Sequence, residues 1–199
     1  ASAATGAVSV QFADRPTVGE DVIAFTGGAG ADDFDVTSIV AADVSTRTID
    51  MKAGNDTLTV DLAEHDTSFS ADGGAGTDAL ELGTNTAITT AAILAKFSNF
   101  EELTIGAGRT VSQDMDFSVS NTVNTVGATS VTLTDVAATG TIVNVKQGTT
   151  GTLDVSDLKA NGAADSITVN LGGTAAAVLS TFTASSNYET ITLNSVGSA

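Results

Sequence analysis

Short runs of β-branched and other apolar residues, alternating with polar ones, recur along the whole chain and predict strands. Glycine, asparagine, aspartate and threonine separate the runs, and these residue types favour turns. The predicted strands are Ala7–Phe12, Thr48–Met51, Thr57–Leu62, Leu103–Ile105, Ser130–Thr134, Thr141–Lys146, Thr152–Val155, Ser166–Leu171 and Thr190–Leu193. Proline occurs once, at Pro16, so almost every run can donate to a continuous ladder of backbone hydrogen bonds.

A glycine-rich turn of the form G-G-x-G-x-D-x-U, where U is a large apolar residue, recurs three times. Its copies are Gly27–Phe34, Met51–Leu58 and Gly73–Leu80. Their starts lie 24 and 22 residues apart, and the middle copy lacks the first two glycines. A coil of two nine-residue half-turns has about 18 residues. The excess fits small bulges at Ser38–Val44 and Ala63–Thr67, so the three turns are expected to stack on one edge.

A longer repeat joins a strand, one or two turns of helix and a second strand. In the first unit Asp78–Gly83 leads to Ala91–Phe97 and Ser98–Ile105; in the second Asp165–Gly172 leads to Ala176–Phe182 and Ser186–Leu193. The helical apolar residues expected to face inward are Ile93, Leu94 and Phe97, then Val178, Leu179 and Phe182. The second unit's turn has decayed to Asn161–Asp165, and we expect no calcium there.

These patterns predict an all-β chain folded as a parallel β-roll or β-helix solenoid with one or two short helices. Residues 1–108 would form a solenoid with calcium-binding glycine turns, and residues 109–199 would continue it with a degenerate repeat, in one continuous domain. Aromatic residues make up 5% of the chain, which favours a slender stack whose layers each bury a few residues over a wide globular core.

The net charge of −17, from 24 acidic and 7 basic residues, excludes nucleic acid as a natural partner and favours cations. The chain has no cysteine, which excludes thiolate chemistry. No apolar run reaches the roughly 18 residues of a membrane span. The first six residues, 1–6, lack the features of a signal peptide, and we expect the sequence to be a piece of a longer chain.

The residues of the glycine turns are of the types that can bind a metal ion. Glycine permits positive φ, so each loop turns tightly and directs carbonyl oxygens toward one point, which the aspartate closes. Calcium takes six to eight oxygen ligands, so two stacked loops could complete a cage that one loop cannot. The loops of Asp32 and Asp56 would form one cage, and those of Asp56 and Asp78 a second. An ordinary acidic hairpin explains one such turn but not three in phase.

The three glycine turns resemble the RTX calcium-binding repeats. The run from Phe25 through Asp78, the strand Asn99–Leu103 and the remainder rich in Ala, Thr, Val and Gly more narrowly resemble the surface-layer (S-layer) proteins of Gram-negative bacteria. The resemblance covers about half of the chain. It implies a parallel β-roll, type I secretion without an amino-terminal signal peptide, and folding triggered by calcium outside the cell.

The resemblance also implies a set of Ca²⁺ ligands. Carbonyls of Gly27 and Ala29 with the Asp32 carboxylate would face carbonyls of Lys52 and Gly54 with Asp56. A second ion would use Met51, Ala53 and Asp56 against Gly74, Gly76 and Asp78. Met51 and Lys52 stand where the family has glycine, although a backbone carbonyl survives a change of side chain.

The expected function is therefore structural and not enzymatic: a calcium-binding S-layer segment, secreted to the bacterial cell surface, that assembles with copies of itself. Cell-surface lipopolysaccharide is a second candidate partner. An RTX adhesin stalk and a carboxyl-terminal RTX secretion domain of a protease or lipase remain open.

His65, between Glu64 and Asp66, fits a solvated loop, and the repeated Glu101 and Glu189 fit a role at strand starts.

Overall fold

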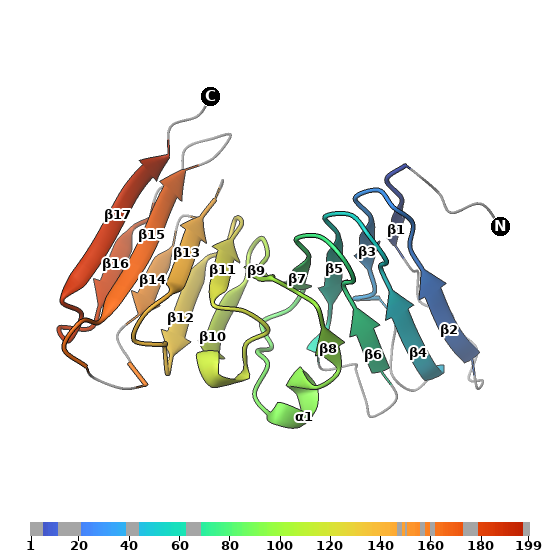
Figure 1. Ribbon diagram of the computed structural model, residues 1–199, viewed down its shortest axis with the longest axis horizontal. Helices are drawn as coiled ribbons and strands as arrows, with labels where there is room; N and C mark the ends of the chain where they lie inside the picture. Colours follow the sequence, from blue (N-terminus) through green and yellow to red (C-terminus); the bar gives the residue numbers. More distant parts are fainter. Residues whose placement is uncertain are drawn as a thin grey trace.

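The chain folds as a parallel β-solenoid, which confirms the predicted fold class (Figure 1). The computed structural model describes residues 6–11, 21–38, 44–62, 69–146, 149, 151–155, 158–159, 162–172 and 179–196. The strands of one side are β1 (Ser9–Gln11), β3 (Asp33–Asp35), β5 (Thr57–Val60), β7 (Ala79–Leu82), β9 (Glu102–Ile105), β11 (Thr122–Thr125), β13 (Thr141–Val145), β15 (Ser166–Gly172) and β17 (Thr190–Val196). They form one nine-stranded sheet in that order, here called sheet A.

The opposite side consists of two four-stranded sheets. One contains β2 (Asp21–Thr26), β4 (Val44–Asp50), β6 (Phe69–Asp72) and β8 (Phe97–Ser98); the other contains β10 (Thr110–Asp114), β12 (Ser130–Thr134), β14 (Thr152–Val155) and β16 (Thr181–Ala184). We call them sheets B and D. Successive strands alternate between sheet A and the opposite side, so each coil adds one rung to both.

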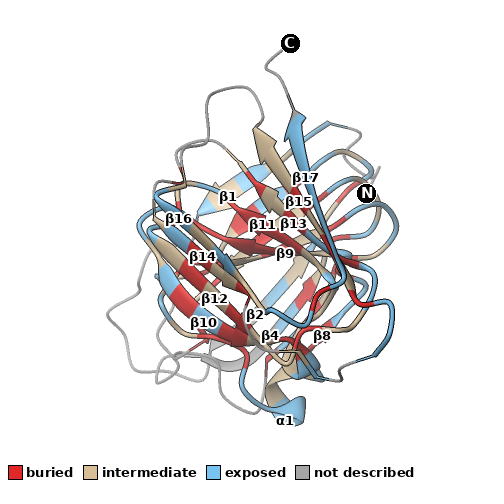
Figure 2. Ribbon diagram, turned by 90° about the vertical axis from the view of Figure 1, so that its left-hand side faces the viewer, coloured by how far each residue is buried: buried red, intermediate tan, exposed pale blue. Residues whose placement is uncertain are grey.

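The core lies between the two sides and consists of columns of apolar side chains. Inward-facing residues at matching positions of sheet A pair from rung to rung and are fully buried; one such column is Phe34, Leu58, Leu80, Leu103, Val123, Val143 and Val169. Buried positions alternate with more exposed ones along the strands (Figure 2). Each rung therefore buries only a few side chains, and stability comes from stacking the rungs.

On the opposite side, sheets B and D meet at the coil between β7 and β9, which contacts both of them. The first part of this coil lies beside β10, where the backbone N–H of Thr110 donates to the Asn85 side chain at 2.9 Å. The fully buried Gln113 side chain donates to the Ile88 carbonyl at 2.9 Å and accepts from the Ile88 N–H at 3.0 Å. The chain then passes through helix α1 (Ala91–Leu94) to β8, which pairs with β6. Gln113 thus replaces a ladder of backbone hydrogen bonds at the end of sheet D.

The strand predictions are confirmed, because each predicted run overlaps an observed strand. The first predicted helix is confirmed only over Ala91–Leu94, because Phe97, expected on its inward face, lies in β8 and pairs with Ala71. Met115–Phe117 adds one 3₁₀ turn, η3. The second predicted helix is wrong at its end, because Thr181 and Phe182 lie in β16 and pair with β14. Residues 173–178, His65 and most of the two expected bulges lie outside the described residues. None of the described helices has the length and hydrophobicity to span a membrane.

We predict that Gln113→Leu lowers the free energy of unfolding by about 2–4 kcal/mol, because it leaves the buried N–H and carbonyl of Ile88 without partners. Urea denaturation measures the loss. Ser112→Ala, on the exposed face of the same strand, should change stability by less than about 0.5 kcal/mol. Equal effects of the two substitutions would contradict the assigned role of Gln113.

Candidate metal centre

The three glycine turns stack on one edge of the solenoid. They connect β2 to β3, β4 to β5 and β6 to β7. Strand pairing fixes their alignment, because Thr26, Asp50 and Asp72 pair in series before the turns. A backbone bridge between Ala53 and Ala75 joins the second and third turns directly. The 24- and 22-residue spacings therefore correspond to one complete coil each.

Glycine is required where one turn lies against the next. A Cβ on Gly76 would lie 1.5 Å from the Gly54 carbonyl oxygen, and one on Gly54 would lie 2.3 Å from the Gly30 carbonyl oxygen. Both glycines also have positive φ, 151° and 145°, a region that other residues rarely adopt. The absence of a side chain lets carbonyl oxygens of one turn approach the backbone of its neighbour.

Lys52 adopts a φ of 76° at a position where the first and third turns have Gly28 and Gly74. This left-handed conformation costs a non-glycine residue about 1–2 kcal/mol. Its ammonium group pairs with Asp50 at 2.5 Å, and half of the side chain is exposed. The Lys52 carbonyl accepts a hydrogen bond from the Ala75 N–H at 2.8 Å. The backbone of the middle turn thus keeps the glycine-like shape despite the change of side chain.

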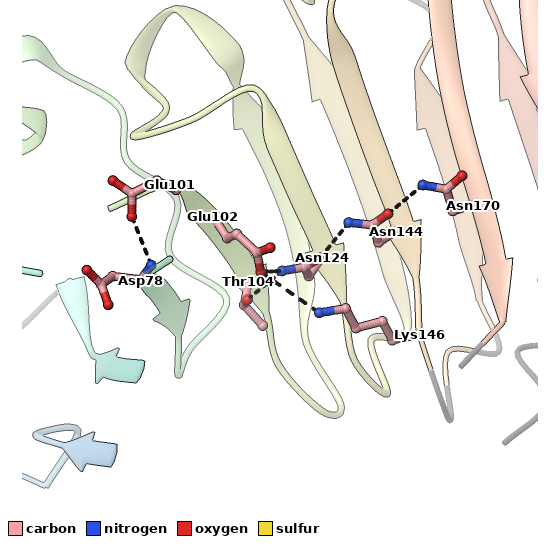
Figure 3. Close-up of polar contacts among 8 residues, drawn as sticks. All are labelled: Asp78, Glu101, Glu102, Thr104, Asn124, Asn144, Lys146 and Asn170. Carbon is pink, nitrogen blue, oxygen red and sulfur yellow. Dashed lines mark hydrogen bonds and ion pairs between the residues drawn. The ribbon is translucent and has the colours of Figure 1, made fainter. Parts of the chain in front are cut away.

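The turn carboxylates bind the backbone of the preceding coil, a feature that the sequence analysis missed. Asp32 accepts from the Val8 N–H at 2.9 Å, Asp56 from the Asp32 N–H at 2.7 Å, and Asp78 from the Asp56 N–H at 2.8 Å. Glu101 continues the series by accepting from the Asp78 N–H at 2.8 Å (Figure 3). We call this series the carboxylate ladder.

The same contact recurs in the second half, where Glu189 accepts from the Asp165 N–H at 2.7 Å. Asp165 also accepts from the Gly162 N–H of its own turn at 2.8 Å. The ladder therefore accounts for the repeated glutamates just before β9 and β17, in agreement with the strand-start role predicted for Glu101 and Glu189. Their recurrence after Asn-Phe and Asn-Tyr was the signal available in the sequence.

Two carboxylate oxygens in the turns lack a hydrogen-bond donor within the described residues. Oδ2 of Asp56 and Oδ2 of Asp78 are buried and, within the described part of the chain, accept no hydrogen bond. The corresponding oxygen of Asp32 accepts from the Gly28 N–H at 2.8 Å. A buried carboxylate oxygen without a donor is costly. Asp56 and Asp78 therefore lack a partner that Asp32 has within its own turn.

Burial raises the pKa of the Asp56 carboxyl, and the negative charge of Asp32 raises it further against the opposing hydrogen bond from the Asp32 N–H. Burial likewise raises the pKa of Asp78, with contributions from the charges of Asp56, Glu101 and Asp72. Stacked carboxylates thus repel one another along the edge. A bound cation would reverse both effects, because it favours the charged form.

Carbonyl and side-chain oxygens of the turns lie close to the backbone of the neighbouring turn along this edge. The Met51 carbonyl oxygen and Asp32 Oδ2 lie 2.2 and 2.7 Å from the position that a Cβ on Gly27 would take. The Gly54 carbonyl oxygen and Asn55 Oδ1 lie 1.5 and 3.2 Å from the corresponding position on Gly76. In the part of the chain that the structure describes, no three acidic or histidine side chains meet. Carbonyls would therefore supply most of the ligands.

We predict that Gly76→Ala destabilises the protein by several kcal/mol, because the new methyl group would overlap the Gly54 carbonyl oxygen. Gly108→Ala is the matched control: Gly108 also has positive φ, 71°, but no atom lies within 4 Å of the added Cβ. The control should lose only about 1–2 kcal/mol from backbone strain. Urea denaturation compares the two, and equal losses would show that the turns are not closely stacked.

Comparisons of the chain with protein-family models, curated proteins and solved structures found no match. The features that distinguish this edge are three turns in register, glycines at the contacts between turns, and buried carboxylate oxygens at Asp56 and Asp78.

Proposed function

We propose that the chain is a structural, calcium-binding segment of an RTX-type S-layer protein, secreted to the bacterial surface, where it assembles with copies of itself. The observation that carries the calcium part of the proposal is the pair of buried Oδ2 atoms of Asp56 and Asp78, which accept no hydrogen bond from the described residues and lie in glycine turns stacked in register. Hard cations with flexible coordination prefer such carboxylate and carbonyl oxygens.

One Ca²⁺ ion would lie between the first and second turns and another between the second and third. The carbonyls of Gly27, Ala29 and Met51 with the carboxylates of Asp32 and Asp56 would hold the first ion, because the Met51 carbonyl oxygen lies against Gly27 of the first turn. The carbonyls of Lys52, Ala53, Gly54, Gly74 and Gly76 with Asp56 and Asp78 would hold the second. The Lys52 and Gly54 carbonyl oxygens, assigned from the sequence to the first ion, lie against Gly74 and Gly76 of the third turn. Asp56 would serve both ions because its turn is the middle one.

Calcium would act as a folding switch by offsetting charge repulsion along the stacked edge. The chain carries a net charge of −17, and burial, together with the charge of the acid in the preceding turn, raises the pKa of Asp56 and of Asp78. A ligand that binds only the folded state stabilises it by about 2.7 kcal/mol at a free concentration 100 times its Kd. Calcium-rich surroundings outside the cell would then favour a stiff solenoid suited to lattice formation.

We predict that excess chelator lowers the melting temperature and weakens the β-sheet signal in circular dichroism, and that added calcium restores both. The expected shift is at least several degrees, since about 2–4 °C accompanies each kcal/mol in a chain of this size. Magnesium at equal concentration is the control, because it resists dehydration and irregular coordination. An unchanged spectrum and melting temperature after chelation would rule out the switch.

We predict that Asp56→Asn removes two bound calcium ions, whereas Asp32→Asn and Asp78→Asn each remove one. Asparagine keeps an oxygen that can accept the backbone hydrogen bond of the carboxylate ladder, so each substitution chiefly removes charge. Isothermal titration calorimetry gives the stoichiometry, and circular dichroism with calcium checks the fold. The same loss of stoichiometry in all three variants would refute a shared ligand at Asp56.

A further inference from the structure

The outer face of sheet A changes character midway along the solenoid. Its outward positions carry Asp33 and Asp35 on β3, Glu81 on β7 and Glu102 on β9. From β11 onward these positions carry no acidic residue in the described strands. We call this second part the neutral face; its outward residues are Thr122, Asn124, Ile142, Asn144, Ser166, Thr168, Asn170, Thr190, Thr192 and Asn194, of which Asn124 is itself buried.

Four asparagines form a hydrogen-bonded row across the neutral face. Asn144 donates to Asn124 at 2.9 Å, Asn170 to Asn144 at 2.7 Å, and Asn194 to Asn170 at 2.8 Å. Figure 3 shows the row from Asn170 to Asn124, which in turn donates to the Glu102 carboxylate. Each amide is held by its neighbours, so the row is ordered before any partner binds.

At the Asn124 end of the asparagine row, the adjacent charges form an ion pair. Lys146 projects from the end of β13 and lies 3.9 Å from the Glu102 carboxylate, which also accepts from Asn124. The charges nearest to the asparagine row are therefore paired with each other. The outer face of sheet D differs, because Asp114 and Asp154 occupy its outward positions.

We propose that the neutral face is a contact surface between two copies of the chain, related by a two-fold axis. This inference rests on the self-assembly in the proposed function and names the surface that would perform it. Copies with a net charge of −17 repel one another, so they approach at lowest cost through a surface without carboxylates. A two-fold axis through the neutral face also directs the two acidic halves away from each other.

The side chains of this surface suit a sheet-to-sheet contact. Ile142 on this face and Val126, which directly follows β11, are 37% and 36% exposed, and their burial would contribute hydrophobic stabilisation. The asparagine row is already ordered, so docking would fix few additional rotamers.

Four strands about 4.8 Å apart and about five residues long present only about 300 Å², well below the roughly 800 Å² per partner of a stable complex. The contact should therefore be weak, and association through it should appear only at high protein concentration.

Thr168→Asp tests the inference by placing a carboxylate in the middle of the neutral face. Thr181→Asp is its control, because it adds the same charge at an exposed position on the outer face of sheet D. Sedimentation velocity at increasing protein concentration, with calcium, measures self-association, and circular dichroism checks the fold. We expect Thr168→Asp to weaken association at least tenfold and Thr181→Asp to resemble the wild type. Equal effects, or a wild type that stays monomeric, would overturn the inference.

Cysteine cross-linking gives an independent readout, because the chain has no cysteine of its own. Thr168→Cys should form a disulfide-linked dimer under mild oxidation, and Thr181→Cys should form much less. A reversed preference would contradict the assigned face. Calcium uptake is measured on the same samples: loss of association in Thr168→Asp without any calcium uptake would support this contact while refuting the calcium site.

Discussion

Successive coils of this chain stack in register, so a side chain at one position lies against its counterparts on the coils before and after it. Backbone hydrogen bonds of parallel strands impose this alignment over all nine rungs of sheet A. Any choice of residue is thereby repeated as a column. Apolar columns build the core, and an amide column satisfies its own donors and acceptors along the asparagine row. A carboxylate column repels itself, and this cost shapes the remaining features of the molecule.

The chain reduces that cost partly with its own backbone. Along the turn edge, one oxygen of each acid accepts a backbone N–H from the preceding coil, from Asp32 to Glu101. Hydrogen bonds to the charged form of a carboxylate favour that form. The second oxygens of Asp56 and Asp78 receive no such bond in the described structure. In the proposed function, calcium between the turns would coordinate these second oxygens.

Sequence reasoning predicted the features that depend on local pattern. Alternating runs such as Thr141–Val145 became strands, and the spacing of the glycine turns matched one coil. It missed features set by pairing between coils. The inward position of Gln113 could not be predicted, because it depends on the Ile88 backbone of another coil. Strand β3 was not predicted, because it is three residues long and has acids on both sides of Phe34. Phe97 and Phe182 were both assigned to helices from their apolar spacing, but they lie in β8 and β16, because pairing with β6 and β14 prevails over that local preference.

The most direct test of the calcium account is a crystal structure grown with Ca²⁺ and measured at a wavelength where calcium scatters anomalously. The account predicts peaks between the stacked glycine turns, with Asp56 Oδ2 and Asp78 Oδ2 within about 2.3–2.6 Å of an ion. Peaks confined to other surfaces, with these two oxygens bonded to protein donors or to each other through a proton, would contradict it.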